Sequence, residues 1–152
     1  MDEDGRRKTR YQGAIVRDDR ILLIEHRVHA TGKSHWLLPG GGREDGETEE
    51  ACVLREMLEE THLEVTLERL LMEEATPNDR VYQGRKTYLC RVTVGEASPG
   101  AEPEPEHSDV YAITDVRWLD LKDPSRWGEA ITSDGKTYPE LARIRQLLGY
   151  GP

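Results

Sequence analysis

The feature that most constrains this chain is a glycine-rich turn followed by a charged segment, residues 40–63, GGGREDGETEEACVLREMLEETHL. From Thr48 to Thr61 there is no Gly or Pro. Thr48 follows the turn-forming pair Asp45-Gly46 and is a suitable N-cap. The stretch therefore predicts a glycine-rich loop that leads directly into a helix.

The predicted helix has an apolar side and an acidic side. At about 100° per residue, the apolar residues Ala51, Leu54, Met57 and Leu58 share one side, and the acids Glu49, Glu56, Glu59 and Glu60 share the opposite one. We expect the apolar side to pack on the core. Arg55 precedes Glu59 by one turn, so the arginine can hold that carboxylate in place.

Carboxylates gathered on one side of a helix repel one another unless a cation neutralises them. Oxygen ligands of this kind suit Mg²⁺ or Mn²⁺. A solvated acidic face is the usual alternative. Here the glycines at 40–42 allow the backbone to approach a ligand, and the loop leads to a helix N-terminus, which favours anions. The combination favours a divalent-cation site.

Six residues of the stretch also match a known spacing. Within G-x5-E-x7-R-E-U-x-E-E, where U is a bulky aliphatic residue, the fixed positions are Gly41, Glu47, Arg55, Glu56, Glu59 and Glu60. The pattern resembles the signature of the Nudix hydrolases, which split nucleoside diphosphates linked to another group. The resemblance implies an α/β fold, the Nudix α/β/α sandwich, with a mixed β-sheet and a loop-helix-loop catalytic motif. One position differs, because His62 stands where the family has Gly, and we expect His62 to end the helix in a left-handed conformation.

The resemblance also implies a metal site that binds Mg²⁺ (or Mn²⁺). The glutamates Glu56, Glu59 and Glu60 would bind the metal directly or through water, and the carbonyl group of Gly40 would be an added ligand.

The same resemblance assigns catalytic roles. Glu56 is the first candidate for the base that activates water, Arg55 would orient a glutamate, and Glu47 would support the loop and the start of the helix. In this family the base can also come from a loop outside the signature segment, residues 41–63, here called the box. The acids available in such a loop are Glu102, Glu104, Glu106 and Asp109. Among these we favour Glu106. A flexible solvated loop is the alternative.

The rest of the chain predicts a mixed sheet with a second helix. Apolar runs at 12–16 and 21–25 indicate a hairpin, and strands are expected at 64–74, 85–94 and within 110–121. A turn at 76–79, a loop at 95–107 and a helix at 138–148 complete the pattern. Arg27, with His26 and His29 beside it, could face a phosphate at the end of a strand, and solvent exposure is the alternative.

With 152 residues the chain fits a single domain, residues 1–152, with one core and a mobile tail at 1–9. Cys52 and Cys90 lack metal-type spacing, so we expect two reduced, half-buried thiols. The first residues lack a signal-peptide core and no apolar run reaches the length of a membrane span, which predicts a cytoplasmic protein that does not bind membranes. The net charge of −9 argues against an extended nucleic-acid surface, but not against a small-molecule nucleotide substrate or a homodimer.

These observations predict an enzyme. The expected reaction is metal-dependent hydrolysis of a pyrophosphate bond in a nucleoside diphosphate linked to another moiety, by in-line attack of an activated water. The substrate could be ADP-ribose-like or a nucleoside polyphosphate; Pro77, about fifteen residues beyond the box, is a weak hint of the former. The alternative is a non-catalytic Nudix-fold module that binds a nucleotide or regulates. Loss of the box acids would mark that alternative, and none is lost here.

Overall fold

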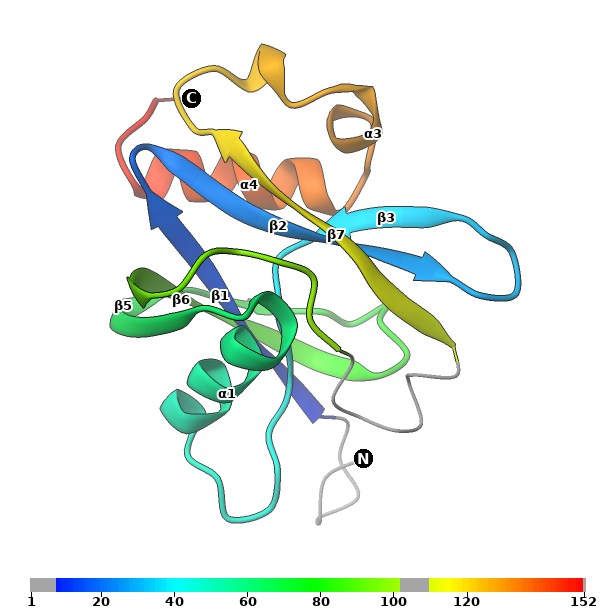
Figure 1. Ribbon diagram of the computed structural model, residues 1–152, viewed down its shortest axis with the longest axis vertical. Coiled ribbons are helices and arrows are strands. Elements are labelled where there is room, and N and C mark those ends of the chain that lie inside the picture. Colours follow the sequence, from blue (N-terminus) through cyan, green and yellow to red (C-terminus); the bar gives the residue numbers. More distant parts are fainter. Residues whose placement is uncertain (1–7, 102–109, 152) are drawn as a thin grey trace.

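The computed structural model describes residues 8–101 and 110–151 (Figure 1). The elements in chain order are β1 (Lys8–Arg17), β2 (Arg20–Val28), β3 (Ser34–Leu37), β4 (Gly40–Gly42), α1 (Glu49–Thr61), β5 (Glu64–Ala75), β6 (Tyr82–Val94), β7 (Tyr111–Asp120), the 3-10 turn η1 (Pro124–Arg126), α3 (Glu129–Thr132) and α4 (Thr137–Leu147).

The strands form a mixed sheet, as predicted. Its order is β3-β2-β1-β6-β5, with β4 paired to β1 and β7 paired to β2. β1 and β6 run parallel, whereas the other described pairs are antiparallel. β1 pairs with β4 through residues 10–12 but with β2 only through residues 16–17. β1 and β2 therefore diverge from the turn that joins them (Figure 1).

That shared turn confirms the hairpin predicted near the N-terminus. Asp18 and Asp19 have φ of 52° and 61°, and Arg17 pairs with Arg20 across them. Two successive residues with positive φ form the turn whose twist matches that of the flanking strands, and Asp tolerates this conformation better than most residues.

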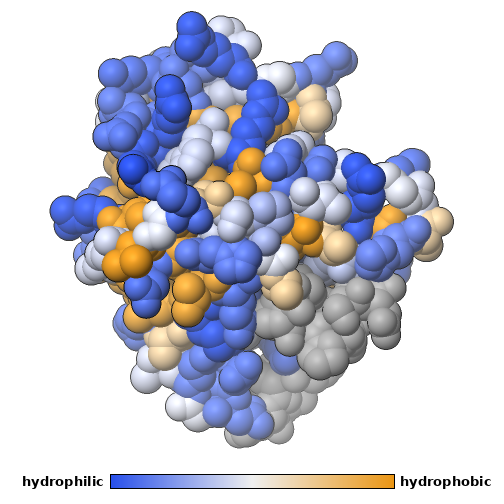
Figure 2. Space-filling view, viewed as in Figure 1, coloured by the Kyte–Doolittle hydropathy of each residue, from blue (hydrophilic) through white to orange (hydrophobic). Residues whose placement is uncertain are grey.

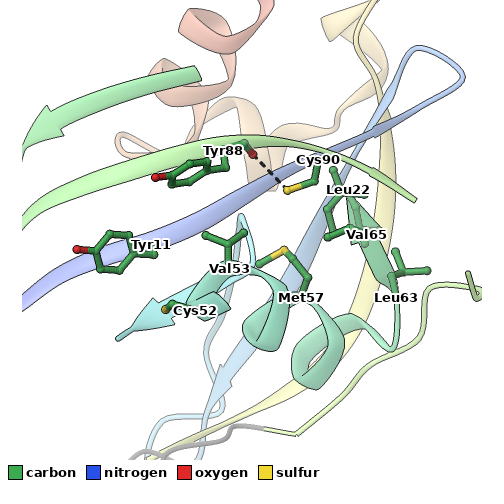
Figure 3. Close-up of a cluster of buried hydrophobic side chains, with 10 residues drawn as sticks. Tyr11, Leu22, Cys52, Val53, Met57, Leu63, Val65, Tyr88 and Cys90 are labelled. Atoms are coloured by element: carbon green, nitrogen blue, oxygen red, sulfur yellow. Dashed lines mark hydrogen bonds between the residues drawn. The ribbon is translucent and has the colours of Figure 1, made fainter. Parts of the chain in front are cut away.

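Two hydrophobic clusters lie on opposite faces of the sheet, where the sequence predicts one core. The first joins α1 to the strands and includes Val53, Met57 and Tyr88 (Figure 3). The second joins the strands to α3 and α4 and includes Ile131 and Leu141. Side chains of a strand alternate between the faces, so β1 supplies both clusters. The α/β/α sandwich is confirmed.

Some details differ from the expectations. Lys8 and Thr9 belong to β1 because they pair with β6, so the tail cannot extend to residue 9; residues 1–7 lie outside the described part of the chain. The thiols of Cys52 and Cys90 are fully buried rather than half-buried. Both lie in the cluster beneath α1 (Figure 3), and burial raises the pKa of each, that of Cys90 to about 12.

Candidate active site

The box helix α1 begins and ends where its sequence predicts. The hydroxyl of Thr48 accepts a hydrogen bond from the Ala51 N–H at 3.1 Å, which satisfies one of the free amides of the first turn. At the other end His62 adopts φ 63° and ψ 19° and donates its N–H to Leu58 O. The left-handed helix end expected at His62 is confirmed. Its exposed ring contacts Ser98, with 2.7 Å between Nδ1 and the Ser98 Oγ.

The face of α1 that packs on the sheet is only partly the one predicted, because Met57 is buried as expected but its predicted neighbours are not. Leu54 and Leu58, expected in the core, are 42% and 47% exposed, and hydrophobic surface gathers near α1 and the ends of β5 and β6 in Figure 2. The buried face instead carries Cys52, Val53, Glu56, Met57 and Glu60. The reason is that Cys52, Val53 and Met57 supply the apolar contacts (Figure 3). The acids beside them lie against β4, where Glu60 accepts the Gly40 N–H and Glu56 fills the space beside Gly41.

Two carboxylates lie against the glycines of β4. Gly40 donates its N–H to Glu60 Oε1 at 2.7 Å. A Cβ atom on Gly41 would collide with the carboxylate of Glu56, whereas a Cβ on Gly42 would make only an ordinary contact, 3.4 Å from the Lys8 Cδ. The glycines that the sequence places in a loop form a short strand paired with β1. The absence of a side chain at Gly41 makes room for Glu56, which is fully buried, as is Glu60.

Arg55 connects three of the box glutamates. Its Nε and Nη2 donate to the two oxygens of Glu47 at 2.7 and 2.9 Å, a two-point contact. Its Nη1 lies 3.1 Å from both Glu56 Oε1 and Glu59 Oε2. These bonds to Glu47 raise the pKa of Arg55 and lower the pKa of Glu47. Arg55 is therefore placed to orient Glu56 and Glu59, while Glu47 holds Arg55.

Glu49, which the helical periodicity places on the acidic side of the helix, contacts β6 and not the other acids. Lys86 Nζ and the Tyr88 hydroxyl donate to its two oxygens, each at 2.9 Å. The contact ties the first residue of α1 to β6. Sequence reasoning missed this tether because the partners lie 37 and 39 residues along the chain.

Arg10 is a second residue that sequence reasoning missed. It lies in β1 and donates from Nη2 to Leu38 O at 2.8 Å, two residues before Gly40. Burial disfavours its charge, but nearby Tyr82, Glu60, Glu56 and Tyr111 outweigh that effect, so the pKa of Arg10 lies above its usual value. A sequence signal for this position would have needed the β1–β4 register, which pairs residue 10 with Gly42.

Of the remaining predicted residues, the one within the described part of the chain, Arg27, is not brought to the box. Arg27 lies exposed on β2, and no contact of the described residues joins it to the acids. The loop acids Glu102, Glu104, Glu106 and Asp109 lie outside the described residues. A pocket of about 340 Å³ opens elsewhere, between the β5–β6 turn and the start of α4. Its wall includes Glu140. The carboxylate of Glu140 accepts a hydrogen bond from Gln12 Nε2 at 3.0 Å and forms an ion pair with Arg85 Nη1 at 2.7 Å.

The box acids have the oxygen ligands that divalent cations prefer, but their carboxylates are not arranged around a single site. In residues 8–101 and 110–151 no three His, Cys, Asp or Glu side chains are arranged as a ready ligand group. Glu56 and Glu59 meet at Arg55 Nη1, while Glu60 contacts Gly40 N. The atoms of Glu56, Glu59 and Glu60 that could bind a metal are all oxygens. The space left by Gly41 lets the Glu56 carboxylate lie against the strand.

The fold and the box have counterparts among known proteins. The chain is 30% identical over 143 residues to MutT4 of Mycobacterium tuberculosis, which covers 90% of this chain and 53% of that protein. It is 34% identical over 122 residues to a protein named ADP-ribose pyrophosphatase from Methanocaldococcus jannaschii, covering 76% and 71%. The chain thus spans about half the length of the first relative and most of the second.

Solved structures share the fold at lower identity. A crystal structure described as UDP-X diphosphatase has a TM-score of 0.68 at 20% identity, covering 95% of this chain and 64% of that one. A NUDIX hydrolase from Nitrosomonas europaea has a TM-score of 0.69 at 20% identity, covering 92% and 70%. No helix in the described part of the chain has the length and apolar character needed to cross a membrane.

A family model described as NUDIX domain matches residues 7–141, nearly the whole chain. The match includes the strand of glycines, the box helix and the sheet that carries them. The chain therefore belongs to the Nudix family.

Proposed function

We propose that this protein hydrolyses a pyrophosphate bond in a nucleoside diphosphate linked to another group, and that it needs Mg²⁺ or Mn²⁺ to do so. The observation that carries the proposal is the placement of Glu56 and Glu60 against β4, with Arg55 holding Glu56 and Glu59. A nucleotide-binding module without catalysis would have no need to bury two carboxylates beside a side-chain-free strand, because taking charged groups out of water is costly even where they have partners.

The residues that would hold the cation are Glu56, Glu59 and Glu60, with the Gly40 carbonyl group as the added ligand. When bound, the ion supplies positive charge for the oxygens of the phosphoryl group and acidifies a water molecule. Arg55 keeps the carboxylates of Glu56 and Glu59 near each other, and Glu47 keeps Arg55 in place.

The reaction breaks one phosphorus–oxygen bond and forms another. Water attacks one phosphorus in line with the bridging oxygen, which leaves with the other half of the substrate. The proton of the attacking water passes to a carboxylate, for which Glu56 is our first candidate and an acid of residues 102–109 the alternative. Either base must lie within hydrogen-bond reach of that water.

The substrate class is supported by the names of relatives. One relative is named an ADP-ribose pyrophosphatase, another an NAD-capped RNA hydrolase, and one solved neighbour a UDP-X diphosphatase. We therefore expect a nucleoside diphosphate joined to a sugar or second nucleoside. The pocket beside α4 has the volume of a small-molecule site and could receive part of such a group.

The proposal is tested by moving one carboxylate without touching it. Gly41→Ala places a methyl group where Glu56 lies, so turnover should fall by about a hundredfold, the order expected when a reacting group is displaced by about 1 Å. The adjacent Gly42→Ala is the matched control, because its Cβ meets only the flexible Lys8 side chain, and it should retain most of the activity.

The assay is release of nucleoside monophosphate from ADP-ribose, a UDP-sugar, a dinucleotide and a nucleoside triphosphate, with Mg²⁺, Mn²⁺ or EDTA. Wild type should turn over at least one compound with metal and none in EDTA. Melting curves establish that both variants fold. Equal activity in the two glycine variants, or full turnover by metal-free protein, would contradict the proposal.

A further inference from the structure

Residues 95–101, which follow β6, lie against the C-terminal end of α1. They belong to no helix or strand. Gly95, at φ 108°, passes so close to His62 that an added Cβ atom would lie 2.9 Å from the His62 carbonyl oxygen. Ala97 packs against the hydrophobic cluster beneath α1. Because it pairs with no strand, the segment depends on contacts with the helix to stay in place.

This segment is bound to the turn of helix that carries two of the box acids. The Gly100 N–H donates to the Glu60 carbonyl oxygen, and the Ala101 N–H donates to that of Glu59. These carbonyl groups belong to the last turn of α1, where a helix has no partner of its own to offer. The Glu60 side chain is held separately, because its Oε1 accepts the Gly40 N–H. The segment therefore fixes the backbone from which Glu59 and Glu60 project.

His62 joins the segment to the helix through its side chain. Its Nδ1 lies 2.7 Å from the Ser98 Oγ and 3.2 Å from the Ser98 carbonyl oxygen. A protonated Nδ1 can donate to either oxygen and an unprotonated one can accept from the hydroxyl, so both neutral tautomers form a bond. The left-handed backbone at this position needs no side chain, since glycine adopts it most readily. The ring thus adds a contact that the helix end itself does not require.

We propose that His62 is a positioning residue, which clasps residues 95–101 to α1 and so keeps Glu59 and Glu60 in place for a divalent cation. The inference rests on the proposed function, because it takes these acids as metal ligands. Without the ring contact the segment separates more often from the last turn of the helix. A set of ligands that is in place for a smaller fraction of the time binds its ion more weakly in proportion.

Two substitutions at residue 62 separate the ring contact from the backbone conformation. His62→Gly removes the contact and suits the left-handed backbone, so the variant should fold. His62→Asn also tolerates that backbone, and its Nδ2 occupies the place of the histidine Nδ1 along the side chain. Asparagine should therefore restore the bond to Ser98 that glycine lacks.

Amide hydrogen exchange, followed by NMR in EDTA, measures the clasp itself. In His62→Gly the Gly100 and Ala101 amides should exchange about fivefold faster, the order expected for the loss of one hydrogen bond. The Cys52 amide donates to Thr48 O at the opposite end of α1, and its exchange should not change. His62→Asn should match wild type at all three amides.

Mn²⁺ binding, measured from the electron paramagnetic resonance signal of the free ion, tests the link to the acids. His62→Gly should bind Mn²⁺ about threefold to fivefold more weakly, because the coupling cannot exceed the contribution of the clasp. His62→Asn should stay within about twofold of wild type. Coupling is reciprocal, so saturating Mg²⁺ should slow exchange of the Gly100 and Ala101 amides in wild type.

Unchanged exchange at Gly100 and Ala101 in His62→Gly would overturn this inference, as would faster exchange without any change in Mn²⁺ affinity. A loss in His62→Asn equal to that in His62→Gly would also overturn it, since the bond to Ser98 would then not be the cause. These outcomes leave the proposed function standing. Failure of wild type and both variants to bind Mn²⁺ would overturn the proposed function together with this inference.

Discussion

Glu47 shows how a residue away from the reacting atoms can decide the stability of the site. Both of its oxygens accept from Arg55, and one also accepts the Glu44 N–H at 3.1 Å. Hydrogen bonds to a charged partner contribute about 1.5–3 kcal/mol each where they are shielded from water. The Glu47 side chain is only 13% exposed, so little of that is lost to solvent.

Glu47→Gln should therefore lower the free energy of unfolding by about 2 kcal/mol at pH 7. The direction in which this stability difference changes with pH follows from the lowered pKa of Glu47 in the folded protein. Its contribution is present above the pKa of an unfolded glutamate, about 4.3, and is lost as the pH falls through the lower folded value. Urea unfolding from pH 7 to pH 3 should show the two proteins converging below about pH 4.

Glu44→Gln provides the matched control for this prediction. Glu44 lies 3.8 Å from the same Arg55 but is 68% exposed, so its removal should change the stability little at any pH. A gap between wild type and Glu47→Gln that does not narrow as the pH falls from 7 to 3 would show that the loss comes from packing and not from the ionised carboxylate.

At the scale of the element, α1 depends on a segment that follows β6. The Ser98 N–H donates to Thr61 O, the Gly100 N–H to Glu60 O and the Ala101 N–H to Glu59 O, at 2.9–3.0 Å. The last carbonyl groups of a helix have no partner within the helix. The segment supplies those partners to the turn that carries Glu59 and Glu60.

Gly100→Ala should disrupt this cap. A Cβ atom there would overlap the backbone of Glu59 and lie 2.8 Å from the Glu60 carbonyl carbon, so the segment must move away. We expect a loss of about 1–3 kcal/mol in unfolding free energy, together with reduced turnover because Glu59 and Glu60 lose their anchor. Chemical denaturation and the nucleotide assay measure the two effects.

Gly135→Ala is the control, because nothing lies within 4 Å of a Cβ at that position. It should leave the unfolding free energy unchanged. Normal stability and turnover in Gly100→Ala would show that the cap does not support the acids.

The limits of sequence reasoning are visible in this same helix. Thr48 and His62 set its ends through local backbone chemistry, and both were predictable. The side of the helix that packs on the sheet was not predictable, because a periodic pattern defines two sides without stating which one meets the sheet. That choice depends on Gly41, which makes room for Glu56, and on Cys52 and Val53, which pack on β1 and β6. The places of Arg10 and Glu49 likewise depend on strand register, which local spacing does not contain.

At the scale of the whole molecule, β1 joins the two halves of the sandwich. The mixed sheet was predictable from hairpins and apolar runs, and the helices on either side of it were implied by the resemblance to the Nudix signature. The division into two hydrophobic clusters was not predictable. Adjacent residues Ala14 and Ile15 enter different clusters. We therefore expect the two faces to unfold together, since neither has a strand set of its own.

The two cysteines report on whether α1 and β6 unfold together. Cys52 comes from α1 and Cys90 from β6, yet both are buried in one cluster and burial raises the pKa of both thiols. Thiolate is the reactive form, so at pH 8 a disulfide reagent should label neither thiol in the native protein and both in urea. Because the folded pKa values lie above the unfolded value of about 8.5, each thiol's contribution to stability is complete below that pH and is lost as the pH rises toward the folded value, about 12 for Cys90.

Cys52→Ala and Cys90→Ala allow the two thiols to be followed one at a time. In low urea at pH 8, where labelling requires opening, both should react with the same urea dependence, which should match that of global unfolding. Much faster labelling of Cys52, with a weaker dependence on urea, would show that α1 separates from the sheet before the rest unfolds. In that case the acids of the box would lie on the least stable part of the molecule, and metal binding should slow the labelling of Cys52 more than that of Cys90.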